Sequence, residues 1–312
     1  MPFKIRALLW YLNRQKGMQI YEMPAAQARQ SSTEVANRAE RFLDGPAIPL
    51  YRVFDQDITG RNGAIPIRVY QPNENENLAV MMFFHGGGFV LRDIESHDKV
   101  CRRLARDNKM IVISVGYRLA PENKFPAGLH DAYDATLWAV KNQAIHNGNP
   151  QKLLVAGDSA GANIATSVCL MARDLKEFDI KFQLLIYPVT DATLSNPSID
   201  ELAEGHLLTK KMMVWFCDQY KRNKEDLYNP LMSPLLAEDL SNLPPAFVLT
   251  AEYDPLKDDG RLYADRLKEA GNDVVFKEYG GMIHAFISMP KLSKRILGTY
   301  RDIKEVLAEV FV

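Results

Sequence analysis

The stretch Val155-Ala156-Gly157-Asp158-Ser159-Ala160-Gly161 decides how the rest of the chain is interpreted. A short apolar run precedes it at residues 153–156, and a helix-like stretch follows it at residues 160–174. Glycines on both sides of Ser159 suit a sharp strand-to-helix turn, in which the two elements pass too close together for Cβ atoms. Such a turn exposes the serine hydroxyl, which is a poor nucleophile unless a base and hydrogen-bond donors lie nearby. Because an ordinary turn explains the pattern equally well, the partners of Ser159 decide the interpretation.

The composition of the chain is that of a globular protein with no strong electrostatic character. Its 312 residues are 47% hydrophobic and 25% charged, and α/β folds often use this length for one domain. The formal net charge of −1 gives no reason to expect nucleic acid or an anionic membrane as a partner. We therefore expect a small-molecule substrate and no nucleic acid.

The cysteines and the N-terminus indicate a cytoplasmic location. Cys101, Cys169 and Cys217 are widely spaced and form no CxxC pair, which argues against a disulfide framework or a zinc site and for a reducing compartment. The apolar patch at residues 7–12 is too short for a membrane span or the core of a signal peptide. We therefore predict a cytoplasmic protein without stable membrane insertion. We expect this N-terminal patch to pack on the protein's own body, with an amphipathic surface segment that touches lipid or substrate as the open alternative.

Apolar runs and helix-like stretches alternate along most of the chain. Alternating polarity predicts strands at 51–58 and 64–70, and apolar runs predict further strands at 78–84, 110–115, 152–156, 182–187, 246–250 and 273–279. The helix-like stretches are 96–108, 131–143, 160–174, 258–270 and 292–310. Strands that alternate with helices imply parallel pairing with right-handed crossovers. The sequence thus predicts an α/β fold with a mostly parallel, doubly wound sheet of about eight strands.

Two segments do not fit this alternation. Residues 1–46 look helical but are broken by glycine and proline, and residues 192–229 contain a helix-like, aromatic-rich segment between two predicted strands. We expect both segments to cover the carboxyl edge of the sheet. No linker divides the chain, so we predict one domain, 1–312, with a cap formed by 1–46 and 192–229.

A run of three glycines directly follows the predicted strand 78–84, in His85-Gly86-Gly87-Gly88-Phe89. Consecutive glycines are costly to order, so they indicate a place where backbone must approach something closely. A phosphate cradle is a weak interpretation because no Gly-Lys-Ser/Thr ending follows, and a plain glycine turn is the simplest one. The other interpretation is an oxyanion hole, in which the N–H groups of Gly87, Gly88 and Ala160 face a developing negative charge.

His284 is the best-placed of the six histidines to serve as a base. It follows the last predicted strand, at the carboxyl edge where doubly wound sheets collect their sites. We expect His85 to brace the glycine loop and His206 to belong to the cap. The remaining three should be solvated or bonded locally: His97, His130 and His146.

An acid that orients the base should also lie at a strand end. Asp254 follows the strand 246–250, with Asp191 as its rival and Glu252 behind both. We favour Asp254 because the order serine, acid, histidine then follows three successive strand ends. Asp158 adjoins the nucleophile, but the turn directs its side chain away, so we interpret it as a structural hydrogen-bond acceptor.

Taken together, these motifs make the chain resemble the hormone-sensitive-lipase-like family of α/β-hydrolase carboxylesterases. The resemblance rests on the residues 85–89, 117–122, 125–127, 157–161, 187–188, 233–235, 254–256 and His284. It implies hydrolysis of carboxylic esters with short to medium acyl chains, without a metal or organic cofactor. It also implies a cap made of N-terminal helices plus an insertion, and a possible homodimer through the edge of the last strand.

The mechanism that follows from the resemblance is covalent. Ser159 attacks the ester, His284 moves the proton, Asp254 holds the ring, and an acyl-enzyme intermediate is then hydrolysed. Candidate walls of the substrate pocket are Phe89, Leu207, Leu208, Phe216 and Phe286. Three rival functions stay open: a non-catalytic binder of small ligands, an amidase or peptidase, and a lipase acting at oil–water interfaces.

Overall fold

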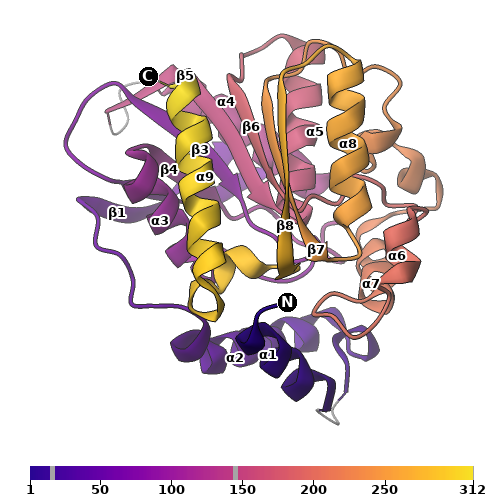
Figure 1. The fold of residues 1–312 in the computed structure, drawn as a ribbon. Helices are drawn as coiled ribbons and strands as arrows, with labels where there is room; N and C mark the ends of the chain where they lie inside the picture. The colour runs from indigo at the N-terminus through magenta and orange to yellow at the C-terminus, as the bar shows by residue number, and fades with distance from the viewer. Residues whose placement is uncertain (15–17, 143–146, 312) are drawn as a thin grey trace.

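The computed structural model describes residues 1–14, 18–142 and 147–311, and their main feature is a single twisted sheet (Figure 1). Within these residues the sheet has eight strands in the order β1-β2-β4-β3-β5-β6-β7-β8. The strands are β1 Arg52–Gly60, β2 Gly63–Gln71, β3 Leu78–Phe84, β4 Ile111–Val115, β5 Gly148–Asp158, β6 Phe182–Ile186, β7 Ala246–Tyr253 and β8 Val274–Ile283. Strands β1 and β2 pair antiparallel with their neighbours, and the pairs from β4 to β8 are parallel. The predicted mostly parallel sheet of about eight strands is confirmed.

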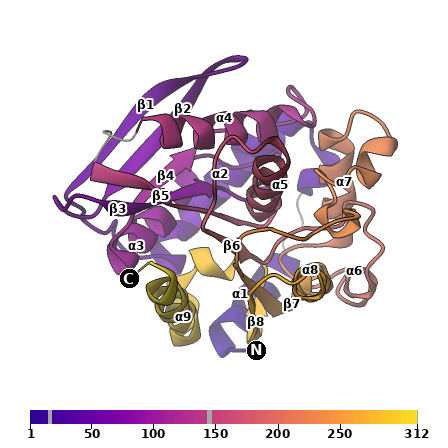
Figure 2. The same cartoon turned by 90° about the horizontal axis from the view of Figure 1, so that it is seen from above.

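Helices cover both faces of this sheet (Figure 2). One face carries α3 Asp98–Asn108 and α9 Lys294–Val310, and the other carries α4 Ala127–Lys141, α5 Ala160–Leu175 and α8 Lys257–Glu269. The short 3-10 helices are η1 Ile20–Glu22, η2 Glu95–His97, η4 Glu225–Tyr228, η5 Pro234–Leu236, η6 Phe286–Ser288 and η7 Pro290–Leu292.

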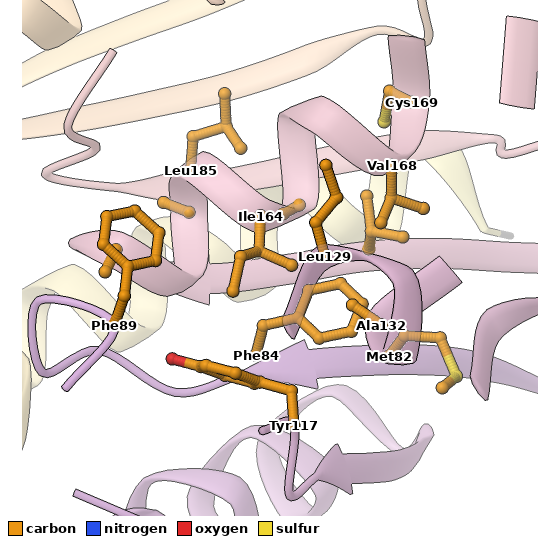
Figure 3. Close-up of a cluster of buried hydrophobic side chains, with 14 of the residues drawn as sticks. Met82, Phe84, Phe89, Tyr117, Leu129, Ala132, Ile164, Val168, Cys169 and Leu185 are labelled. Atoms are coloured by element: carbon orange, nitrogen blue, oxygen red, sulfur yellow. The ribbon is translucent and has the colours of Figure 1, made fainter. Parts of the chain in front are cut away.

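The strands divide their side chains between two apolar cores because successive residues point to opposite faces. In β3, Met82 and Phe84 pack with Leu129 of α4 and Ile164 of α5 (Figure 3). The alternate residues Met81 and Phe83 belong to the core beneath α3 and α9. A strand buried on both faces must be apolar throughout, which is why the continuous apolar runs predict these strands well.

Four helices lie at the end of the molecule where the parallel strands terminate (Figure 1). They are α1 Phe3–Arg14, α2 Ala25–Leu43, α6 Pro197–Glu201 and α7 Lys210–Tyr220. None of the helices in the described ranges has both the length and the hydropathy needed to cross a bilayer.

Several element boundaries differ from those predicted. Strand β5 begins at Gly148, β7 ends at Tyr253 and β8 ends at Ile283, because backbone pairing continues beyond the apolar runs. Helix α4 begins at Ala127, directly after a proline, and the predicted end at Gln143 lies outside the described residues, as does His146.

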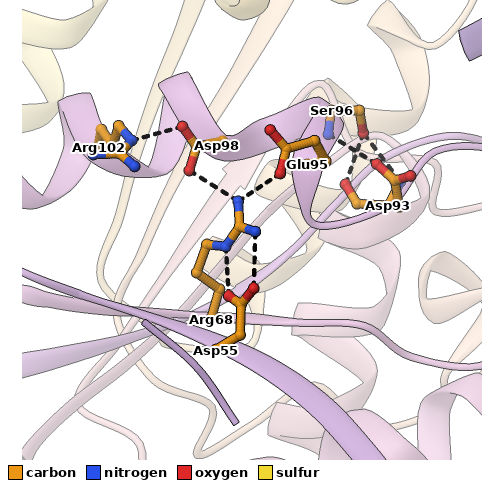
Figure 4. A network of polar contacts seen from close by, with 7 residues as sticks. All are labelled: Asp55, Arg68, Asp93, Glu95, Ser96, Asp98 and Arg102. Atoms are coloured by element: carbon orange, nitrogen blue, oxygen red, sulfur yellow. Dashed lines mark hydrogen bonds and ion pairs between the residues drawn. The ribbon is translucent and has the colours of Figure 1, made fainter. Parts of the chain in front are cut away.

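Arg68 on β2 connects the antiparallel hairpin to the start of α3 (Figure 4). Its guanidinium donates to Asp55 of β1 at 2.6 Å, to Glu95 of η2 at 2.7 Å and to Asp98 of α3 at 3.1 Å. Arg102 of α3 also donates to Asp98, at 2.6 Å. These contacts fix both η2 and the first turn of α3 against the sheet. His97, the last residue of η2, is thereby held 3.0 Å from Asp158, the neighbour of Ser159.

Candidate active site

Ser159 occupies a strained turn between β5 and α5. Its backbone has φ +55° and ψ −120°, a combination that non-glycine residues rarely adopt and that marks functional sites. The two flanking glycines have no room for a side chain. A Cβ on Gly157 would lie 2.3 Å from the carbonyl carbon of Gly161, and one on Gly161 would lie 1.9 Å from the carbonyl oxygen of Phe84. The predicted close passage of strand and helix is therefore present.

The structure brings Ser159, His284 and Asp254 into one hydrogen-bonded chain. His284 Nε2 lies 3.0 Å from Ser159 Oγ, and His284 Nδ1 lies 2.7 Å from Asp254 Oδ2. When Nδ1–H donates to the carboxylate, Nε2 is left as the acceptor for the serine proton. All three side chains are buried, with exposed fractions of 9%, 8% and 0% for the serine, the histidine and the aspartate. This geometry is that of an activated serine nucleophile.

The rival acids have other partners. Asp191 accepts hydrogen bonds from the hydroxyls of Thr193 and Ser195, and Glu252 accepts one from the backbone N–H of Gly281 at 2.6 Å. Asp254 also accepts the backbone N–H of Leu256 at 2.9 Å, which holds the carboxylate toward the imidazole. Of the three acids considered from the sequence, Asp254 is the one in contact with His284.

The glycine loop presents unpaired donors next to the serine. Gly87 and Gly88 have φ values of +124° and +62°, and within the described residues their N–H groups have no hydrogen-bond acceptor. Ala160 is the first residue of α5, where an N–H group has no acceptor inside its own helix. Gly87, Gly88 and Ala160 thus offer backbone donors that the fold does not use, and the pairing of Phe84 with Gly157 puts the glycine loop and the serine turn at neighbouring strand ends.

His85 fixes this loop without acting as a base. Its Nδ1 lies 2.9 Å from the carbonyl oxygen of Gly86, its ring stacks on Tyr117 at 4.4 Å, and the Tyr117 hydroxyl donates to the His85 carbonyl oxygen at 2.6 Å. Burial, together with the nearby charge of His97, lowers the pKa of His85 to about 4. His85 is therefore neutral near neutral pH, and its bracing role is as predicted.

Asp158 and His97 form a second buried pair behind the nucleophile. Asp158 Oδ1 accepts the Gly86 N–H at 2.8 Å and lies 3.0 Å from His97 Nε2, and the Tyr187 hydroxyl donates to Oδ2 at 3.3 Å. Burial acts to raise the pKa of Asp158, but the His97 charge and hydrogen bond, the Gly86 N–H and the His284 charge outweigh it and lower the pKa. Asp158 is thus the structural acceptor that we expected, and it joins the serine turn to the glycine loop.

The expectation for His97 is confirmed only in part. Its Nδ1 is bonded locally, 3.1 Å from the Ser96 hydroxyl, as one of the two alternatives required. The ring is not solvated, however, because His97 is 5% exposed and its Nε2 pairs with Asp158 at the end of β5. A signal was present in the sequence, since His97 precedes Val100, Cys101 and Leu104 at helical spacing and so shares the inward face of α3.

The predicted pocket residues differ in their burial and in their contacts. Phe89 is buried and stacks on Tyr220 of α7 at 3.9 Å, and Phe216 of α7 packs directly against Gly88. Leu208 is buried and Leu207 is half-buried, both in the segment between α6 and α7. Phe286 is a correction, because its ring is fully buried among core aromatics and has no surface left to line a pocket. His206 lies in the same segment as Leu207 and stacks on Tyr253.

Comparisons with known proteins identify relatives of this chain. Residues 81–288 match the model of a family described as alpha/beta hydrolase fold. The chain is 40% identical over 269 residues to the carboxylic ester hydrolase LipN of Mycobacterium tuberculosis, covering 83% of this chain and 71% of LipN. It is 36% identical over 279 residues to an ethyl acetate hydrolase of Pseudomonas putida, covering 88% and 86% of the two chains.

A solved structure extends the likeness to the whole fold. The hyperthermophilic esterase of Pyrobaculum calidifontis superimposes with a TM-score of 0.92 at 40% identity, covering 98% of both chains. The matched region contains the serine turn, the glycine loop, the acid and the histidine. The chain therefore belongs to the alpha/beta hydrolase fold family, among its hormone-sensitive-lipase-like carboxylic ester hydrolases.

Proposed function

We propose that this chain hydrolyses carboxylic esters with short to medium acyl chains through Ser159, His284 and Asp254. The observation that carries the proposal is the hydrogen-bonded chain from the serine hydroxyl to the buried carboxylate, with contacts of 3.0 Å and 2.7 Å. The relatives named as ester hydrolases support the reaction class.

The reaction follows from the roles of these three groups. Ser159 Oγ bonds to the ester carbonyl carbon while its proton passes to His284 Nε2, and the carbonyl electrons move onto oxygen. The Asp254 carboxylate stabilises the imidazolium. Collapse of the tetrahedral species breaks the ester C–O bond, and His284 returns its proton to the leaving alcohol. Water then repeats the two steps on the acyl-enzyme and releases the acid.

The oxyanion of each tetrahedral species is stabilised by the N–H groups of Gly87, Gly88 and Ala160. Each such donor contributes about 2.7–4 kcal/mol in enzymes where one has been removed. The loop is held before substrate arrives, because His85 and Asp158 both bind Gly86, the first through its carbonyl oxygen and the second through its N–H group. Little reorganisation is then needed during the reaction.

The cap is the part of the protein that we propose limits the size of the substrate. We propose that residues 1–46 and 192–229 cover the site within a single domain, and that Phe89, Leu207, Leu208 and Phe216 limit the acyl chain. The contact of Phe216 with Gly88 supports a wall close to the reacting carbonyl. The ethyl acetate hydrolase likeness supports a preference for small acyl groups.

We further propose that the protein is cytoplasmic and forms a homodimer. Cys101, Cys169 and Cys217 are all unpaired, which suits a reducing compartment. Strand β8 is an edge of the sheet and leaves backbone groups that a second copy of β8 can pair with.

The test is hydrolysis of a p-nitrophenyl ester series, from acetate to palmitate, by the wild type and by Ser159→Ala. We expect the wild type to prefer the shorter chains and the variant to fall to background. Equal activity of both proteins would refute the assignment of Ser159, and inactivity of both would favour ligand binding. A matched amide substrate distinguishes an esterase from an amidase, and a jump in rate above the solubility limit would indicate a lipase.

A further inference from the structure

The exposed apolar side chains of this protein are concentrated at its N-terminal end. Of the fourteen large hydrophobic side chains that are exposed in the described residues, six lie within residues 1–43. A scatter of single exposed apolar residues needs no explanation, whereas a concentration of them indicates an interaction surface.

The outer face of α1 carries the most prominent part of this concentration. Ile5 and Leu9 point inward, with exposed fractions of 0% and 7%. At helical spacing, Phe3 and Trp10 fall on the opposite side, and they are 76% and 59% exposed. Tyr11 beside them is 57% exposed. We call this outer side of α1, with Phe3, Arg6, Trp10, Tyr11 and Arg14, the aromatic–basic face.

The charge of the same segment is opposite to that of the rest of the chain. Residues 1–43 contain seven basic and three acidic residues, a charge of +4, so a net charge of −1 leaves −5 for the remainder. Helix α1 itself contains three basic residues and no acidic ones. Our expectation of no anionic membrane partner rested on the net charge, which conceals this separation.

The two arginines of the aromatic–basic face are free to meet an external anion. Arg14 lies over the Trp10 ring at 4.2 Å, and across the described part of the chain neither Arg14 nor Arg6 contacts a carboxylate. Exposed aromatic rings flanked by unpaired cations are the features of a helix that lies in a membrane interface, with its rings at the headgroup level.

Both ends of α1 are attached to elements around the candidate active site. At its start, Pro2 lies so close to Gly281 of β8 that a Cβ there would be 3.0 Å away, and Lys4 donates to the carbonyl oxygen of Lys291 at 3.1 Å. At its end, Asn13 donates to the carbonyl oxygen of Gly205 at 3.1 Å. The helix therefore spans from the end of β8, which directly precedes His284, to the segment that bears Leu207 and Leu208.

From these observations we propose that the aromatic–basic face of α1 docks the protein onto an anionic phospholipid surface. A second copy of the chain is a poor occupant, because a symmetric contact pairs the same patch on both copies and would bring two basic faces with no acidic residue of α1 together. Docking there would hold the carboxyl edge of the sheet close to esters dissolved in the membrane. It is peripheral binding and involves no spanning helix.

The test measures binding and not hydrolysis, so its result does not depend on the proposed function. The full chain carrying Ser159→Ala is mixed with vesicles of phosphatidylcholine alone, or with added phosphatidylserine, and the bound fraction is measured by flotation. We expect binding to the anionic vesicles, weakening with added salt, and a blue shift of tryptophan fluorescence that Trp10→Phe abolishes.

A pair of charge variants assigns the surface. Each basic residue near an anionic membrane contributes about a fivefold change in partitioning, so Arg6→Glu with Arg14→Glu should weaken binding by at least about thirtyfold. Arg301→Glu with Lys304→Glu on the exposed side of α9 gives the same change in net charge and should bind nearly as the parent does. Thermal unfolding confirms that both variants fold.

Three results would overturn the proposal. They are no binding to either vesicle, equal binding to both vesicles, and equal losses in the two charge variants. A change of oligomeric state in the Arg6 and Arg14 variant alone would instead assign the aromatic–basic face to a second copy of the chain.

Discussion

Replacement of Asp158 by alanine tests whether the oxyanion loop is held from behind by the Asp158–His97 pair. The carboxylate is 4% exposed and accepts bonds from Gly86 and His97 at 2.8 Å and 3.0 Å. Hydrogen bonds to a charged group contribute about 1.5–3 kcal/mol each, so loss of both should lower the free energy of unfolding by about 3–6 kcal/mol. Without these hydrogen bonds the loop should position its N–H groups less accurately, so part of the oxyanion stabilisation should be lost. We therefore expect kcat to fall about 10- to 100-fold.

Asparagine at the same position separates the effect of the negative charge from the effect of the hydrogen bonds themselves. Its amide oxygen can accept from both Gly86 and His97, and its NH₂ group can donate to the Tyr187 oxygen, so the links survive as weaker neutral bonds. We expect Asp158→Asn to cost about 2 kcal/mol and to retain most of kcat.

The assays are urea unfolding and steady-state hydrolysis of p-nitrophenyl acetate, with kcat and KM measured separately. A double-mutant cycle with His97→Ala should show that the two substitutions are coupled and not additive. The reasoning is refuted if Asp158→Ala keeps the wild-type kcat, if only KM changes, or if the two effects simply add.

Three further predictions concern the same region. Gly161→Ala should unfold much more easily and lose nearly all activity, because its Cβ would lie 1.9 Å from the Phe84 carbonyl oxygen. The control is Gly298→Ala, whose Cβ meets nothing nearer than 3.7 Å. It should stabilise α9 by about 0.5–1 kcal/mol, measured by thermal unfolding. Gly88→Ala should lower kcat at least tenfold because the new Cβ would lie 2.3 Å from the Phe216 ring, and adding Phe216→Ala should restore part of that loss; a fully active single variant would contradict this. The pKa of Asp158 is lower in the folded protein than in the unfolded chain, where it is about 3.9. The ionised carboxylate therefore stabilises the fold above that unfolded value, and the stabilisation is lost as the pH falls through the folded pKa. Between about pH 4 and pH 2, the free energy of unfolding in urea should thus depend less on pH in Asp158→Asn than in the wild type.

The sheet and the reacting groups could be predicted because their sequence signals are local. A strand buried on both faces must be continuously apolar, so β3 was predicted with its observed ends, Leu78 and Phe84. Ser159 and His284 follow strand ends, and the parallel topology alone brings the carboxyl ends of such strands to one edge. The choice of Asp254 over Asp191 depended on the order of the strands along the chain.

The direction in which a side chain points could not be predicted in irregular segments. Phe286 is two residues after His284, but a left-handed backbone at Ala285 and the following 3-10 turn direct its ring into the core. Outside regular elements no periodicity shows which residues share a face, so nearness to His284 in sequence was a poor guide. His97 differs, because its helical register with Val100 and Leu104 did carry the information.

The separation of Ser159 from His284 in the chain offers a way to measure the fraction of molecules in a sample that are folded. The two residues are 125 positions apart, and β6 and β7 lie between their strands in the sheet. The serine is thus an ordinary alcohol until four strands, β5 to β8, have assembled. A phosphonate that reacts only with an activated serine would label intact molecules and leave partly unfolded ones unmarked. In a mixture with aggregates or proteolytic fragments, the labelled fraction would then give the native population directly.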